Sequence, residues 1–284
     1  MALMTKVVAA LDETGAAGPV ARAAVDLGAL VAAEVEAVHV ATGTGSHGAA
    51  TAASHFGLPL SILKGEVVAE LAAAGAADDV EALVVGTRRI PGGTYPVGHV
   101  PLELAARLQV PILVVAPDST VSTSELVGSS TASLDKADHG ARIGAKPKVV
   151  IALDASASAD QVLKKVVERM AARGAEVVAL HVFNEYSTPK FWDQQSHADN
   201  PWTEEFVARH LGIPGIRLEL RSGSPASRIV EMATAEGAIM IVLASSGRID
   251  AGHSEVAREV LSRSSVPVLL VPKAYTEASA LDGT

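Results

Sequence analysis

Cysteine is absent from the 284 residues of this sequence, and only 3% of them are aromatic. Without cysteine there is no disulfide framework, no thiolate metal site and no cysteine nucleophile. The low aromatic content means that any core must be built from Val, Leu, Ile and Ala. Such a core is feasible because 49% of the residues are hydrophobic.

Long apolar runs and an excess of basic residues are also missing. The N-terminus, MALMTKVVAALDET, has no basic region followed by a long apolar stretch. Runs such as Ile239–Ala244 are far shorter than the roughly 20 residues that cross a bilayer. The net charge of −9 argues against a general nucleic-acid binder. These features predict a cytoplasmic protein with no nucleic-acid or membrane partner.

Signatures of several enzyme classes are absent as well. The sequence has no GxxxxGK[ST] phosphate loop, no GxSxG nucleophile elbow and no HExxH zinc motif. Its Asp, Glu and His residues show no spacing typical of a metal site. Slow ATP hydrolysis is the one activity left open, and the sequence identifies neither a base nor a metal ligand for it.

What the chain does contain is an internal repeat. Lys6–Asp12 (KVVAALD) matches Lys148–Asp154 (KVVIALD), and Val38–Val40 matches Leu180–Val182, both at an offset of 142 residues. Further matches at offsets of 158 and 156 pair Gly65–Ala72 with Gly223–Val230, Leu83–Gly86 with Ile241–Ala244, and Val110–Val115 with Val266–Val271. Because the matches keep the same order, they predict two similar domains.

Within each repeat, short Val-rich runs alternate with helical patterns. In the first repeat we expect strands at Lys6–Leu11, Val35–Val40, Leu60–Leu63, Ala82–Gly86 and Pro111–Ala116. We expect helices near Val20–Ala32, between the second and third strands, at Glu66–Ala77 and at Pro101–Leu108. Continuous apolar strands are typical of parallel sheets that are buried on both faces. The pattern predicts an α/β fold with two repeated, doubly wound five-stranded parallel sheets, and a ligand crevice at the carboxyl ends of the strands.

The repeat also sets the expected domain boundaries. We predict a first domain at 1–117, a linker rich in Ser, Thr, Gly and Ala at 118–147, a second domain at 148–273 and a tail at 274–284. The second repeat has an insertion at Asn184–Pro201, which carries Trp192. This insertion is either a lid over the crevice or a surface loop that packs one Trp on its own domain.

Several segments together resemble the universal stress protein family in its tandem two-domain form. They are VVAALDET and VVIALDAS, the HV that ends each second strand, GSPASRIVEMATAEGAIMIVLASSG, and the endings VPILVV and VPVLLV. The resemblance implies an adenine nucleotide α-hydrolase-like, Rossmann-like fold, with ATP or AMP bound in some members. It also implies pairing through the last strand, which the two halves can supply within one chain as a pseudo-dimer, with or without a further homodimer.

Nucleotide binders of this family carry Gly, two residues, Gly, nine residues, and Gly with Ser or Thr after the fourth strand. Glycines let backbone N–H groups approach phosphates, and a hydroxyl donates one more hydrogen bond. The first half departs from this pattern, because Arg89 replaces the middle glycine, His99 replaces the hydroxyl residue, and the loop is one residue shorter.

The resemblance nevertheless assigns a candidate nucleotide site to the first half. Asp12 would lie near the adenine and ribose, and Val40 would line the base pocket. The full set is Asp12, Val40, Gly86, Thr87, Arg88, Arg89, Gly98, His99 and Val100. The alternatives are a purely structural turn for the loop and a turn or helix-cap role for Asp12.

The second half departs further from the binding pattern. Ala244 replaces the first glycine, and Glu255 would repel a phosphate. The corresponding residues are Asp154, Ser245, Gly247, Arg248 and Ser254. Here the sequence favours turn and N-cap roles for the serines over nucleotide binding.

Two histidines, His39 and His181, recur at one position of the repeat. We expect them to be hydrogen-bonded structural residues at strand ends, since nothing nearby completes a catalytic triad. An acid/base pair of His253 and Glu255 is a further alternative. The sequence as a whole predicts a regulatory or stress-tolerance module in which ATP or AMP orders the loop Thr87–Val97. A nucleotide-free interaction module built as a pseudo-dimer is the alternative.

Overall fold

The computed structural model describes residues 5–43, 45–88, 97–119, 146–153, 161–183, 213, 216–245 and 254–273. The first half holds β1 (Lys6–Ala10), α1 (Ala17–Val31), β2 (Glu34–Val40), α2 (His47–His55), β3 (Leu60–Leu63), α3 (Val67–Gly75), β4 (Val80–Gly86), α4 (His99–Arg107) and β5 (Ile112–Val115). The second half holds β6 (Lys148–Leu153), α5 (Gln161–Ala172), β7 (Glu176–Phe183), β8 (Arg217–Ser222), α7 (Pro225–Ala235), β9 (Met240–Ser245), α8 (Glu255–Arg263) and β10 (Val268–Pro272).

The predicted repeat is visible in these elements, which follow the same order in both halves. The strand β3 has the predicted bounds, and the other strands of the first half differ from prediction by one or two residues at an end. The helix α4 begins at His99, two residues before the predicted start. Its N-cap is Gly98, whose φ of +85° a residue with a side chain rarely adopts. Pro101 therefore lies in the first turn, where a missing N–H leaves no intrahelical bond unmade.

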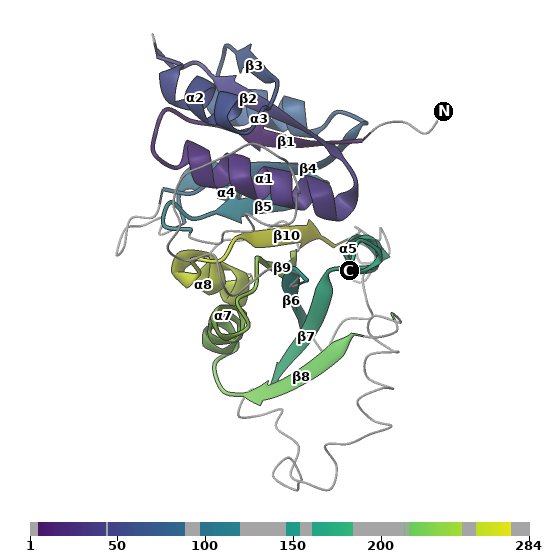
Figure 1. The fold of residues 1–284 in the computed structure, drawn as a ribbon. Helices are drawn as coiled ribbons and strands as arrows, with labels where there is room; N and C mark the ends of the chain where they lie inside the picture. Colours follow the sequence, from purple (N-terminus) through teal and green to yellow (C-terminus); the bar gives the residue numbers. More distant parts are fainter. Residues whose placement is uncertain are drawn as a thin grey trace, which may run out of the picture.

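All ten strands in the described residues form one sheet in the order β3-β2-β1-β4-β5-β10-β9-β6-β7-β8. Each half is a five-stranded parallel sheet, as predicted, and the two are joined where β5 and β10 pair antiparallel, with Leu269 opposite Leu113. Figure 1 shows these two strands side by side in the middle of the molecule. Because the seam is antiparallel, the carboxyl ends of the strands in the two halves face opposite edges of the common sheet.

Helices cover both faces of the sheet, and each face has its own apolar core. One core packs under α1, α2 and α5 and includes Leu113 and Leu269. The other packs under α3, α4, α7 and α8 and includes Val114 and Val268. Each core contains residues of both halves, so burial of aliphatic side chains is continuous across the seam. The large side chains that are fully buried are Leu, Ile and Met, as the low aromatic content predicted.

Several sequence predictions fall outside the described residues. They are the insertion Asn184–Pro201, the tail 274–284 and nearly all of the linker, of which only 118–119 and 146–147 are described. The same holds for four predicted site residues, namely Arg89, Asp154, Gly247 and Arg248.

Candidate functional site

Asp12 lies directly beyond β1, at the carboxyl edge of the first half. Its Oδ1 atom accepts hydrogen bonds from the backbone N–H of Thr14 at 2.9 Å and from the Thr14 hydroxyl at 2.6 Å. This is an Asx-type turn that leads into α1, so the turn role that the sequence suggested for Asp12 is confirmed. The second carboxylate oxygen, Oδ2, lies 3.6 Å from Nη2 of Arg88.

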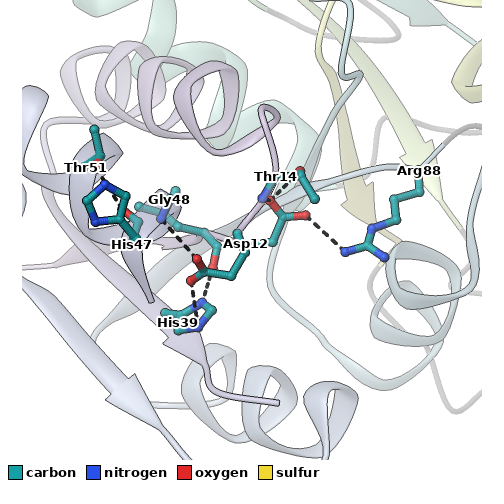
Figure 2. A network of polar contacts seen from close by, with 9 residues as sticks. Asp12, Thr14, His39, His47, Gly48, Thr51 and Arg88 are labelled. Carbon is teal, nitrogen blue, oxygen red and sulfur yellow. Dashed lines mark hydrogen bonds and ion pairs between the residues drawn. The ribbon is translucent and has the colours of Figure 1, made fainter. Parts of the chain in front are cut away.

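The contact with Arg88 joins two predicted site residues across neighbouring strands, because β1 pairs with β4. Figure 2 shows the guanidinium of Arg88 reaching toward the carboxylate of Asp12. The Arg88 side chain is 77% exposed and that of Asp12 is 39% exposed. Both groups therefore remain accessible to a ligand at this edge.

The root of the β4–α4 loop is held rigidly. Thr87 is buried, its backbone N–H donates to the carbonyl of Val115 at 2.9 Å, and its hydroxyl donates to the carbonyl of Val97. The hydroxyl thus closes the base of the loop. Gly86, which ends β4, packs against α1, since a Cβ at this position would lie 3.2 Å from a methyl group of Val20.

The N-terminus of α4 lies against this root. A Cβ on Gly98 would lie 3.5 Å from both the backbone N and O atoms of Arg88, so the first turn of α4 begins close to Arg88. Its N-cap residue, Gly98, has no side chain that could cap it. His99, its first residue, places Nε2 2.7 Å from Oε1 of Glu103, and Val100 follows it on the helix. A helix N-terminus without a side-chain cap favours an anion, because its first N–H groups have no intrahelical acceptor.

Val40 ends β2, the strand beside β1. Its side chain is buried in the core under α3 and α4. The expected position of Val40 near the carboxyl edge is therefore correct, and its side chain also belongs to the fold.

The two repeated histidines have the structural role that the sequence predicted. Nδ1 of His39 lies 2.9 Å from the carbonyl of Leu11, and Nδ1 of His181 lies 3.0 Å from the carbonyl of Leu153. A carbonyl only accepts, so Nδ1 carries the proton in both rings. Each histidine ties the end of one strand to the end of its neighbour.

A residue that the sequence did not suggest, Glu13, adds a second tie in the first half. Its Oε2 accepts the backbone N–H of Gly48 at 3.0 Å, and its Oε1 lies 3.2 Å from Nε2 of His39 (Figure 2). The geometry of the second contact is not that of a hydrogen bond. The contact is an ion pair only when His39 is protonated. The repeat gave no signal here, because Ala155 stands at the equivalent position of Glu13.

Gly48 makes this arrangement possible by its lack of a side chain. A Cβ on Gly48 would lie 2.8 Å from the backbone oxygen of Glu13. The loop after β1 and the N-terminus of α2 are therefore in direct backbone contact.

The described ends of the corresponding loop in the second half carry different side chains. Ser254 is the counterpart of Gly98 and also has a positive φ, of +55°. It occupies the N-cap position of α8, but its side chain makes no cap hydrogen bond, so the N-cap role expected for it is wrong in that respect. Ser245, the counterpart of Thr87, is likewise buried, and its carbonyl accepts the N–H of Lys273 at 2.7 Å.

The charges around α4 affect one neighbouring carboxylate. Glu66 caps α3, and hydrogen bonds from the backbone N–H groups of Val68 and Ala69 lower the pKa of its carboxyl group. The positive charge of Arg107, and that of His99 when it is protonated, lower this pKa further. Glu66 therefore interacts with groups at both ends of α4.

Other features of the described residues lie apart from this edge. A groove of about 500 Å³ lies between α1 and α5, at the start of β4, and its walls include Leu27, Val31, Val162 and Val166. Among the described residues, His, Asp and Glu side chains form no group that could hold a metal ion. In the same ranges, no helix has both the length and the apolar character needed to cross a membrane.

Comparison with known proteins gives one family. Residues 147–272, in the second half, match the model of the universal stress protein family. No curated protein matches the chain.

Three solved structures share the fold over nearly the whole chain. A universal stress protein from Archaeoglobus fulgidus is 16% identical, with 94% of this chain and 98% of that chain covered and a TM-score of 0.61. A protein of unknown function from Pseudomonas aeruginosa is 13% identical, with coverage of 95% and 93% and a TM-score of 0.57. A putative universal stress protein from Pseudomonas aeruginosa is also 13% identical, with the same coverage and a TM-score of 0.54. At these identities the likeness shows the fold alone.

Proposed function

We propose that the chain is a tandem universal stress protein that holds ATP or AMP at the carboxyl edge of its first half. Its domains would span 1–117 and 148–273, with a linker at 118–147 and a tail at 274–284. Two observations support a tandem arrangement. The halves repeat the same order of elements, and the likeness to the Archaeoglobus fulgidus protein extends over 94% of this chain.

The observation that carries the nucleotide site is the convergence of Asp12, Arg88 and Gly98. The cationic side chain of Arg88 lies near the N-terminus of α4, which follows Gly98, and this combination suits a phosphate. The carboxylate of Asp12 lies beside them and suits sugar hydroxyls or amino groups. The phosphates would lie at the start of α4. The sugar and base would extend toward Asp12 and Val40.

The proposed role is regulation rather than chemistry. Nucleotide binding would change the surface of the loop Thr87–Val97, which a protein partner then reads in a stress response. Such a module needs a site that binds and releases nucleotide, and it needs no catalytic base.

Titration with ATP and AMP, followed by backbone amide NMR, tests the site directly. We expect saturable shifts at Arg88, Gly98 and His99, and none at Ser245 or Ser254. The second half serves as an internal control, because it has the same fold with Ser246 and Ser254 in place of Arg88 and Gly98. If neither nucleotide saturates the protein at millimolar concentration, the proposal is wrong.

A nucleotide-free interaction module is the second candidate function. It is favoured by the antiparallel seam, which joins the halves into one continuous sheet, and by the ion pair that spans the edge between Asp12 and Arg88. This candidate predicts that ATP and AMP leave all amide positions unchanged. The same titration therefore distinguishes the two functions.

A further inference from the structure

We propose that Arg88 exchanges partners when ligand binds, leaving Asp12 for a phosphate, and that this exchange makes the site selective for phosphorylated nucleosides over nucleosides. The inference rests on the proposed nucleotide site in the first half. It assigns Arg88 a specificity role that the glycine pattern of the loop does not contain.

The backbone of Arg88 is already placed for this role. Thr87 is held on one side by hydrogen bonds to Val115 and Val97, and Gly98 lies in close contact with the Arg88 backbone on the other. The Arg88 Cα atom is therefore fixed beside the N-terminus of α4. A phosphate bound by the first N–H groups of that helix would lie within reach of this side chain.

The side chain, by contrast, extends away from the helix. It crosses to the neighbouring strand and ends 3.6 Å from Asp12, as Figure 2 shows. With 77% of the Arg88 side chain exposed, this contact is a solvent-screened pair at the outer limit of ion-pair distance. A guanidinium binds a phosphate in a bidentate geometry that is stronger than such a pair, so a phosphate at α4 would displace Asp12.

The exchange changes Asp12 as well as Arg88. Oδ1 of Asp12 stays bound to the backbone N–H and hydroxyl of Thr14, so the carboxylate keeps its position. Oδ2 loses the guanidinium and becomes a free acceptor for a hydroxyl or amino group. A ligand that carries both a phosphate and such a donor makes both contacts, whereas a nucleoside must compete with Arg88 for Asp12.

The second half lacks the arginine of this exchange at the equivalent position of its sequence. Ser246 stands at the equivalent position of Arg88, so the residue that exchanges partners in the first half has no cationic counterpart at that position. The exchange that we propose for Arg88 is therefore specific to the carboxyl edge of the first half.

The test compares AMP with adenosine as ligands, by calorimetric titration of the full chain. The wild type should bind AMP at least roughly tenfold more tightly than adenosine. In Arg88→Gln the ratio should fall to about twofold or less. AMP should bind more weakly, and adenosine should bind more tightly, because it no longer competes with Arg88 for Asp12. In Asp12→Asn the ratio should rise, because Arg88 has lost its competing carboxylate.

Arg107→Gln is the matched control. It removes the same charge at the other end of α4, where Arg107 is paired with Glu103. It should leave the ratio of AMP to adenosine affinity unchanged. Equal affinities of AMP and adenosine in the wild type would overturn the exchange and leave the nucleotide site intact, as would an unchanged ratio in Arg88→Gln. If neither ligand binds, the proposed function fails together with this inference.

Discussion

The carboxyl edges of the two halves share a residue of positive φ before the last helix, and they differ in its ψ angle and in their side chains. Gly98 and Ser254 occupy equivalent positions before α4 and α8, and both have a positive φ. Thr87 and Ser245 are both buried beneath them. The two conformations differ, because Gly98 has a ψ of 159° whereas Ser254, with a ψ of 40°, lies in the left-handed region. The positive φ is common to both halves, whereas the phosphate site that we propose would depend on a few residues of the first half.

The edge beside β1 and β2 shows the same contrast. His39 and His181 make equivalent bonds to Leu11 and Leu153, but only the first half adds Glu13. A repeated contact supports the fold in both halves. A contact that is found in one half only is a candidate for a function that this half alone has.

The largest expected effect comes from the two histidines. His39→Leu should lower the free energy of unfolding by about 2–3 kcal/mol under conditions in which His39 is protonated, because it leaves the buried Leu11 carbonyl unpaired and removes the ion-pair partner of Glu13. His181→Leu should cost about 1–2 kcal/mol, for the loss of the Leu153 bond. Urea denaturation measures both values. Equal losses would show that Glu13 adds nothing, and Glu13→Gln should bring the two costs together.

A smaller effect on stability is expected from substituting Gly98 and Ser254, which both have a positive φ. Gly98→Ala should cost about 1–2 kcal/mol, and this cost reports backbone strain because a Cβ has ordinary contacts there. Ser254→Gly should stabilise the protein by at most about 1 kcal/mol, since relief of strain is offset by the greater entropy of glycine in the unfolded chain. Thermal unfolding of both variants checks the opposite signs. A cost for Ser254→Gly would show that the serine side chain stabilises this turn.

The smallest effect is expected from the caps of α3 and α7. Glu66 accepts two backbone N–H groups, whereas Ser224 at the equivalent position makes no side-chain cap bond. Glu66→Ala should therefore lower the melting temperature more than Ser224→Ala does.

The effect of Glu66 should also depend on pH. Its pKa in the folded protein is lowered below the ordinary value of 4.5, so its contribution to stability is fully present above pH 4.5 and is lost as pH falls through the folded pKa. The difference in melting temperature between wild type and Glu66→Ala should shrink at acid pH. A difference that stays constant with pH would show that the carboxylate is not the source of the stabilisation.

Much of the fold could be predicted because the burial of each segment is reflected in its local pattern of apolar residues. Apolar runs such as Leu83–Val85 mark strands, since a parallel strand is covered on both faces. The repeat then identified which residues of the two halves are equivalent, and the matching bonds of His39 and His181 confirm this alignment. The start of α4 was predicted two residues late, because Pro101 is a stronger local signal than a glycine that acts through its φ angle.

The sequence by itself determined the α/β class, the repeat, the aliphatic cores and the departure of both loops from the family's glycine pattern. Only the tertiary structure decided that the ends of β1 and β4 bring Asp12 to Arg88, and that Glu13 reaches His39 and Gly48. The antiparallel seam that places the two carboxyl edges on opposite sides is another such result. The physical reason is distance along the chain: periodicity reports the burial of each segment, whereas a polar contact between remote loops depends on how the strands are ordered and paired.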